Sequence, residues 1–191
     1  MSNNDREPIA FSGSSPSIVK AKDRVLVILI GIGANLPSIE FGAPPASLEA
    51  ALLMLQQSGV VVVGRSRWYR TAPVPISDQP WFVNGVAAVE TALDPAALLS
   101  VLQATEARFG RIRRERNAAR ILDLDILDYA GQVSEGGAPP LTLPHPRLAE
   151  RAFVLLPLAE VAPRWRHPGT GAGINELLRH LPAGQAAVPL P

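Results

Sequence analysis

The hydrophobic positions along the chain predict strands and helices in alternation. A continuous apolar run at residues 25–30 is typical of a strand that is buried on both faces. Later runs are rich in β-branched residues or alternate between apolar and polar positions, which also indicates strands. The helical segments follow Ser47 or Asp94-Pro95 and stop before Gly59 or Gly110, which are common start and stop residues. The predicted strands are 25–30, 60–69, 82–91 and 122–129, and the predicted helices are 48–57 and 95–109.

The order of these elements, β-α-β-β-α-β, predicts an α+β protein with a ferredoxin-like plan. In that plan, helices cover one face of a mainly antiparallel sheet. Two more helical segments are predicted at 151–161 and 174–181 as C-terminal additions. The expected organisation is a disordered N-terminal tail over 1–23, a single domain over 24–181 and a C-terminal tail over 182–191.

Gly31 and Gly33 directly follow the first predicted strand. The Gly-Lys-Ser/Thr of a phosphate-binding Walker loop does not follow them, and a lone G-x-G is weak evidence for a dinucleotide site. We therefore expect these glycines to form a tight turn.

The composition fits one folded domain, because 47% of the residues are hydrophobic and 18% are charged. A net charge of +1 gives no general attraction to nucleic acid or to a membrane. The absence of cysteine excludes disulfides, thiolate nucleophiles and zinc–thiolate sites, and is compatible with a reducing compartment. Residues 1–23 lack the apolar core of a signal peptide. We expect a cytoplasmic monomer.

Two carboxylates interrupt the last predicted strand. Asp123 and Asp125 flank Leu124 in an otherwise apolar run. Residues two apart in a strand point to the same face, about 6.5–7 Å apart along the chain. Such a pair repels itself unless a cation lies between, and Mg²⁺ prefers one or two carboxylates together with phosphate oxygens. The alternative is that one aspartate caps a turn and the other faces solvent.

Arginines gather just before this strand, at Arg108, Arg111, Arg113, Arg114, Arg116 and Arg120. Glu115 is the only acid among them, and Asn117 with two alanines makes part of the segment small. A loop of this kind could close over a triphosphate, exclude water and stabilise the charge of a transition state. The alternative is a solvated surface loop.

A second group of residues could recognise a flat ring. Thr71, Val74, Trp81, Phe82 and Asn84 combine a proline-rich loop, two aromatics and an amide that both donates and accepts. Phe82 and Asn84 share one face of the predicted strand, whereas Trp81 points to the other. One of the two aromatics is therefore expected in the core.

Three further polar residues are candidates for nucleotide contact. Gln103 and Glu106 are three residues apart on the second predicted helix and share a face, although a solvent-facing polar stripe explains them equally well. His145 lies between two prolines and is followed by Arg147 and Arg151, so phosphate contact is plausible and metal binding less so.

The motifs together, in order and spacing, resemble the 6-hydroxymethyl-7,8-dihydropterin pyrophosphokinase (HPPK) family over about residues 25–163. The matching motifs are the early Gly-x-x-x-Asn-Leu, Tyr69-Arg70-Thr71, Asp78-Gln79-Pro80, Arg111-Ile112-Arg113, Arg120 to Asp125 and Leu143-Pro144-His145-Pro146. Members of that family are ferredoxin-like, in agreement with the strand order.

The resemblance implies a reaction in which ATP gives its terminal diphosphate to the hydroxymethyl group of the pterin and AMP leaves, a step of folate biosynthesis. It implies two Mg²⁺ ions on Asp123 and Asp125, and Arg111 and Arg120 as stabilisers of the transferring group. The proton acceptor is either Asp125 or a metal-bound water. The residues implied to contact ATP are Gln103, Glu106, Arg113, His145 and Arg151. The residues implied to form the pterin slot are Thr71, Val74, Phe82, Asn84 and Phe153, with the ring between the two phenylalanines.

Three rival hypotheses are open. A ferredoxin-like domain can bind RNA on its sheet, but that requires central-strand aromatics in a pattern that this chain lacks. A catalytically inactive relative is a second possibility, against which the two aspartates and the two key arginines argue. A different ATP-dependent transferase is the third, and the identity of the released nucleotide would separate it from a pyrophosphokinase.

Overall fold

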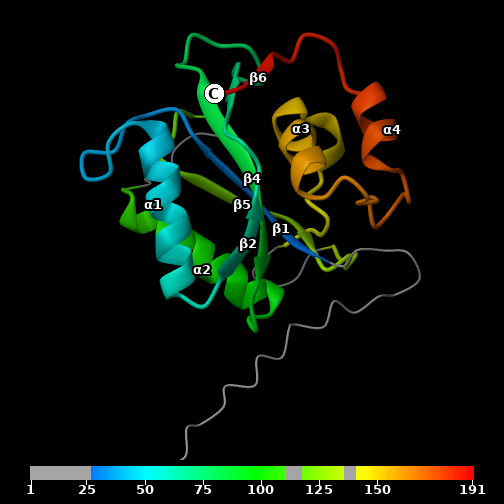
Figure 1. Cartoon of the computed structure of the whole chain (residues 1–191), viewed down its shortest axis with the longest axis horizontal. Coiled ribbons are helices and arrows are strands. Elements are labelled where there is room, and N and C mark those ends of the chain that lie inside the picture. The colour runs from blue at the N-terminus through cyan, green and yellow to red at the C-terminus, as the bar shows by residue number, and fades with distance from the viewer. Residues whose placement is uncertain (1–26, 111–117, 136–140) are drawn as a thin grey trace, which may run out of the picture.

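The computed structural model describes residues 27–110, 118–135 and 141–191. Its centre is an antiparallel sheet in the order β5-β1-β4-β3-β6, with β2 paired to β4 beside this path (Figure 1). The strands are β1 (Ile28–Ala34), β2 (Val61–Arg65), β3 (Tyr69–Thr71), β4 (Phe82–Glu90), β5 (Asp123–Tyr129) and β6 (Ala187–Pro189). The helices are α1 (Pro44–Gln57), α2 (Pro95–Arg108), α3 (Ala152–Val161) and α4 (Ile174–Arg179), with a 3-10 turn η1 (Leu148–Glu150).

The apolar strand β1 lies at the centre of the sheet, as its continuous hydrophobic run predicts. It pairs antiparallel with β4 on one side and with β5 on the other, so that Gly33 faces Asn84 and Gly31 faces Asp125. The spatial order of the four main strand segments is fourth, first, third, second along the chain. The predicted ferredoxin-like α+β fold is confirmed.

Both faces of the sheet carry helices. In Figure 1, α1 and α2 lie on one side of the sheet, while α3 and α4 lie on the other. Leu48, Leu98 and Leu124 are among the buried residues of the core under α1 and α2. Leu127 and Leu155 belong to a second core under α3. The position of α1 and α2 on one face agrees with the prediction. On the other face, α3 covers part of the sheet surface that an RNA-binding ferredoxin-like domain would need to expose.

The predicted strand at 60–69 is divided into β2 and β3, which pair with successive parts of β4. At the break, the backbone N–H of Ser66 donates to the carbonyl of Val86 and the N–H of Val86 donates to Ser66 Oγ. The ring of Trp68 lies against Gly85, where a Cβ atom would come within 2.6 Å of it. The hydrophobic pattern could not show this interruption because it depends on a partner strand about 20 residues away.

The two glycines after residue 30 do not form the expected turn. Gly31 and Gly33 lie inside β1, which continues to Ala34. A Cβ at Gly33 would lie 2.2 Å from Asn84 Oδ1, and one at Gly31 would lie 3.3 Å from the Leu127 side chain. Their lack of a side chain therefore leaves room for neighbouring strands rather than turning the chain.

The helix ends agree in part with the expected signals. Asp94 caps α2, because its Oδ1 accepts a hydrogen bond of 2.8 Å from the N–H of Ala97. For α1 the N-cap is Ala43, and the helix begins at Pro44, three residues before the expected cap Ser47. Ser47 is fully buried and donates to the carbonyl of Gly42 instead.

The segment expected as a C-terminal tail contains β6, which is antiparallel to β3, so that expectation is wrong for Ala187–Pro189. Just before it, Gln185 accepts a hydrogen bond from the N–H of Ala152 and donates one to the carbonyl of Glu150. The end of the chain is thus attached both to the edge of the sheet and to the start of α3. The expected tail at 1–23 lies outside the described residues.

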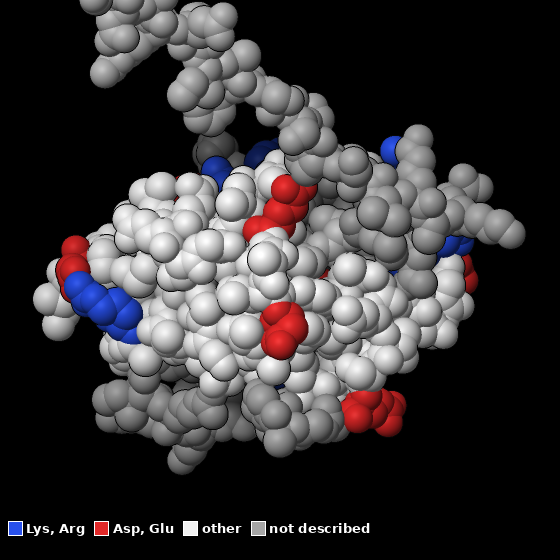
Figure 2. Space-filling model, turned by 90° about the horizontal axis from the view of Figure 1, so that it is seen from below, with Lys and Arg blue, Asp and Glu red and all other residues white. Residues whose placement is uncertain are grey.

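Charged side chains are sparse on the face shown in Figure 2, and its few arginine side chains lie near the margins. This face of the described residues therefore offers no continuous basic surface. None of the described helices has the length and apolar character needed to cross a bilayer.

Candidate active site

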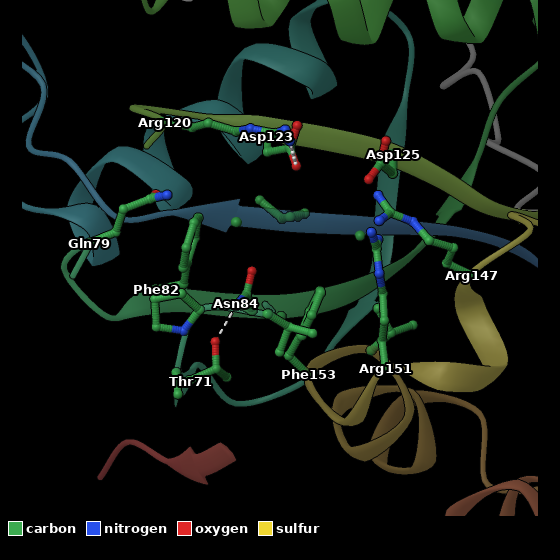
Figure 3. A pocket seen from close by; sticks show the side chains of 18 of the residues that line it. Thr71, Gln79, Phe82, Asn84, Arg120, Asp123, Asp125, Arg147, Arg151 and Phe153 are labelled. Atoms are coloured by element: carbon green, nitrogen blue, oxygen red, sulfur yellow. Dashed lines mark hydrogen bonds and ion pairs between the residues drawn. The ribbon is translucent and has the colours of Figure 1, made fainter. Parts of the chain in front are cut away.

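A pocket of about 500 Å³ opens on the face of the sheet that carries α3 (Figure 3). Its floor comes from β1, β4 and β5, and its walls come from the loop after β3, the turn before η1 and the start of α3. Predicted site residues that line it are Thr71, Val74, Phe82, Asn84, Arg120, Asp123, Asp125, His145, Arg151 and Phe153. The sequence motifs that are far apart in the chain are therefore brought together here.

Asp123 and Asp125 both line the pocket, whereas Leu124 between them is buried in the core on the opposite face of β5. The expectation that the two carboxylates share a face is confirmed, and the alternative of a cap and a solvent-facing acid is wrong. Arg120 lies beside them, with its Nη1 in an ion pair with Asp123 Oδ2. The side chain of Asp123 is still 22% exposed, so a ligand in the pocket can reach it.

The carboxylate pair fits a magnesium ion that is shared with a substrate. Within the described parts of the chain, no three histidine, cysteine or acidic side chains gather as a complete metal cage. Mg²⁺ commonly takes only one or two protein carboxylates and completes its octahedron with water and phosphate oxygens. Asp123 and Asp125 supply that number of hard oxygen ligands on the part of the pocket floor formed by β5.

Asn35 fixes the position of Arg120. Sequence analysis noted Asn35 only as part of the Gly-x-x-x-Asn-Leu motif and assigned it no chemical role. Its Oδ1 accepts the Arg120 N–H at 2.7 Å, and the backbone N–H groups of Asn35 and Leu36 donate to the Arg120 carbonyl. Its Nδ2 donates to the side chain of Gln79 and to the Pro80 carbonyl. Asn35 is 4% exposed, so this connection between the end of β1, Arg120 and the loop after β3 is buried.

A polar slot lies at the other end of the pocket. Asn84 Nδ2 donates to Thr71 Oγ1 at 2.6 Å, and both residues are buried. Phe82 and Phe153, from β4 and α3, also line the pocket and flank Asn84 in Figure 3. Trp81 is not among the lining residues and lies against the guanidinium of Arg70. Phe82 shares the pocket with Asn84 and Trp81 does not, as expected. The expectation that one of the two aromatics lies in the core is wrong, because Trp81 is 43% exposed and Phe82 lines the pocket.

His145 is held as a neutral ring. Its backbone N–H donates to the Leu127 carbonyl, and its Nδ1 accepts the backbone N–H of Arg147 at 3.1 Å. Burial, together with the positive charges of Arg151 and Arg147, lowers the pKa of His145 to about 4. At neutral pH the ring proton therefore lies on Nε2, which is available as a donor.

Arg151 is placed at the start of α3, next to the carboxylate pair. Burial lowers the pKa of Arg151, the charge of Arg147 adds to this effect, and Asp125 and Asp123 oppose it. Its guanidinium also lies 5.2 Å from the ring of Phe153. One side chain thus bridges the acidic and the aromatic parts of the pocket.

Glu106 and Gln103, expected at the nucleotide, are not among the residues that line the pocket. Glu106 is 3% exposed, and its Oε1 accepts the backbone N–H of Leu124 at 2.7 Å. It therefore supports the strand that carries the two aspartates from beneath. The solvent-facing interpretation is wrong for Glu106, and its buried role could not be predicted because the partner is a backbone group on another element. Contact of Gln103 and Glu106 with a nucleotide stays a prediction.

Two predicted site residues, Arg111 and Arg113, fall in 111–117, outside the described residues. Their expected roles stay predictions. Conversely, the pocket includes Gln79 and Arg147, which were not proposed as site residues. Gln79 belongs to a recognised motif and Arg147 follows His145, so both had a weak signal in the sequence.

Fold and pocket define a ferredoxin-like domain in which a carboxylate pair, arginines and a polar aromatic slot share one cavity, a class of site suited to phosphorylated substrates. Comparison with known proteins is more specific. Residues 29–163 match the family model described as 7,8-dihydro-6-hydroxymethylpterin-pyrophosphokinase (HPPK). The chain belongs to the HPPK family.

Individual relatives agree. The 2-amino-4-hydroxy-6-hydroxymethyldihydropteridine pyrophosphokinase of Methylorubrum extorquens is 44% identical over 136 residues, which cover 70% of this chain and 81% of the relative. The protein of the same name from Pseudomonas aeruginosa is 41% identical over 165 residues, covering 85% and 91%. A solved HPPK-DHPS structure in complex with substrates aligns with a TM-score of 0.58 at 14% identity, over 80% of this chain and 43% of that one. This last likeness supports the fold.

Proposed function

We propose that this protein transfers the terminal diphosphate of ATP to the hydroxymethyl oxygen of 6-hydroxymethyl-7,8-dihydropterin and releases AMP, as a step of folate biosynthesis. The observation that carries the proposal is that the carboxylate pair and the buried Asn84–Thr71 pair open into one pocket. A phosphate donor and a flat polar acceptor could therefore be held side by side. Membership of the HPPK family supports the same assignment.

Asp123 and Asp125 are proposed to hold two Mg²⁺ ions together with the phosphates of ATP. Bound there, the ions would neutralise phosphate charge and align the attacking and leaving oxygens. The protein contributes the carboxylates on a rigid strand, supported from beneath by the hydrogen bond of Glu106 to Leu124.

Asn84 is proposed to recognise the polar edge of the pterin with its amide, because the carboxamide of this residue is fixed by Thr71 and faces the pocket. Phe82 and Phe153 would enclose the ring between them, and Val74 would cover its rim. Stacked aromatic contacts exclude water from the reacting oxygen. Together these residues orient the hydroxymethyl group toward the carboxylate end of the pocket.

In the transfer itself, the hydroxymethyl oxygen attacks the β-phosphorus, and the bond from that phosphorus to the oxygen bridging the α- and β-phosphates breaks. AMP leaves with that oxygen, and the hydroxyl proton passes either to Asp125 or to a water molecule, which would be metal-bound when Mg²⁺ is present. Arg120, anchored by Asn35, is proposed to stabilise the charge that builds on the transferring group. His145 would donate from Nε2 and Arg151 would donate from its guanidinium, both to the nucleotide. Arg111, Arg113, Gln103 and Glu106 are kept as expected contacts of the reaction centre or of ATP.

The test is the identity of the released nucleotide. The purified protein is incubated with Mg²⁺, ATP and the pterin alcohol, and nucleotides are separated by ion-pair chromatography. AMP and a pterin diphosphate are expected in equal amounts, and omission of the pterin alcohol should stop AMP formation. Release of ADP would assign a different phosphotransferase, and the absence of either nucleotide would refute the proposed activity.

A further inference from the structure

Arg147 is an exposed residue on a fixed piece of backbone at the edge of the pocket. Its N–H donates to His145 Nδ1 at 3.1 Å, and the N–H of Leu148 donates to the His145 carbonyl at 3.0 Å. His145 is itself attached to β5 through the Leu127 carbonyl. The base of the Arg147 side chain is therefore held in place even though its end is solvent-accessible.

Arg147 and Arg151 extend toward the same place. Figure 3 shows the two side chains leaving the turn before η1 and the start of α3 and pointing toward Asp125. They are close enough for the charge of Arg147 to lower the pKa of both Arg151 and His145. Across residues 27–110, 118–135 and 141–191, neither guanidinium forms an ion pair.

Two guanidinium groups that face one pocket repel each other, and this cost grows where burial weakens solvent screening. A bound anion with several oxygens removes the repulsion and can accept hydrogen bonds from both planar forks. A triphosphate chain that begins at Asp123 and Asp125 could extend directly to these arginines. The neutral His145, which also lines the pocket, adds a donor without adding charge.

We propose that Arg147 and Arg151 together form a binding site for a phosphate of the nucleoside triphosphate, in which Arg147 is the outer member. This inference rests on the proposed function and deepens it by adding Arg147 to the residues proposed to contact the nucleotide. Because Arg147 lies at the rim, it contributes affinity for the triphosphate, whereas Arg120 beside the carboxylates acts on the transferring group.

Equilibrium binding separates these roles without turnover. The probe is the ATP analogue with a methylene group between its α- and β-phosphates, because that bond cannot be cleaved by the transfer, and its affinity is measured by calorimetry in Mg²⁺. Arg147→Ala is expected to weaken this binding about tenfold, the lower end for a charge-assisted hydrogen bond because the site is at the rim. The affinity of Arg147→Lys for the analogue should lie between those of wild type and Arg147→Ala, since lysine keeps the positive charge and loses the planar guanidinium fork.

The matched control is Arg164→Ala, which removes an exposed arginine outside the pocket and should leave binding unchanged. Binding of the pterin alcohol alone should be the same in wild type and Arg147→Ala. In turnover, the KM for ATP should rise in Arg147→Ala while kcat stays within about twofold.

If Arg147→Ala bound the analogue with the affinity of wild type, the inference would be overturned, and Arg147 would be a solvated arginine without a ligand. Equal weakening of pterin and nucleotide binding would also overturn it, because it would indicate a structural role. In both cases binding by wild type would still support the proposed function. If wild type itself failed to bind the analogue, the proposed function and the inference would both be refuted.

Discussion

Replacing Gly33 with alanine is expected to damage the polar slot from behind. A Cβ at this position would lie 2.2 Å from Asn84 Oδ1, far inside contact distance, and 3.3 Å from Asn84 Cγ, slightly inside it. The strand β1 is central and paired on both sides, so its backbone cannot move away easily. Asn84 must rotate instead, and this rotation breaks its 2.6 Å hydrogen bond to Thr71 Oγ1.

The expected loss of stability follows from these two effects. Overpacking a well-packed interior typically costs about 1–3 kcal/mol. Losing a buried hydrogen bond adds about 1 kcal/mol, and Thr71 is only 1% exposed, so water cannot readily replace the lost donor. Together these effects predict a decrease of about 2–4 kcal/mol in the free energy of unfolding.

The assay is urea unfolding followed by tryptophan fluorescence, with the pterin alcohol titrated separately by calorimetry. Gly64→Ala is the matched control, because its Cβ would meet only Ala88 and Val161 at 3.9 Å. That control should be neutral or slightly stabilising, since glycine weakens a strand relative to alanine. Equal stability of Gly33→Ala and Gly64→Ala would refute the reasoning, as would unchanged pterin affinity in a destabilised Gly33→Ala.

Three further predictions concern single residues. Arg120→Ala should lower kcat with little change in the KM for ATP, because this arginine is proposed to act in the transition state. Steady-state kinetics measure both constants, and a change confined to KM would contradict this role. Asp128→Ala should reduce the free energy of unfolding by about 2–3 kcal/mol in urea titrations, because the indole N–H of buried Trp165 would lose its hydrogen bond of 2.7 Å to the Asp128 carboxylate. A loss below about 0.5 kcal/mol would contradict this prediction. For His145, whose pKa is lowered to about 4, the unfolded chain takes up the proton first, so ligand-free stability should fall as pH drops from about 6.5 to 4. In His145→Gln this decrease in the free energy of unfolding should be smaller by about 2–3 kcal/mol, as measured by parallel urea titrations. Identical pH profiles of stability for wild type and His145→Gln would contradict the assigned environment of the ring.

The features that could be predicted from the sequence are those that depend on residues close together in the chain. The apolar run of β1, the Asp94 cap of α2 and the alternation around Leu124 are local patterns, and the structure confirms each of them. The shared face of Asp123 and Asp125 follows from strand geometry alone.

The features that sequence analysis missed depend on partners far along the chain. At positions 31 and 33 a side chain would crowd Leu127 and collide with Asn84, respectively, on the adjacent strands, so only glycine fits well. Residues near in sequence carry no sign of this requirement. The strand β6 forms in a segment rich in proline and small residues because β3 offers a free edge. The roles of Glu106 and Asn35 lie in hydrogen bonds to backbone groups on other elements.

The central claim is that the carboxylates of β5 hold magnesium with the nucleotide during diphosphate transfer. Its most direct test is AMP formation by wild type, Asp123→Asn and Asp125→Asn over a range of Mg²⁺ concentrations. Glu135→Gln, which changes an exposed carboxylate outside the pocket, serves as the control. Both aspartate variants should lose AMP formation at every magnesium concentration while their circular dichroism and melting temperatures stay close to those of wild type. Turnover by Asp123→Asn at the rate and magnesium dependence of wild type would contradict the account.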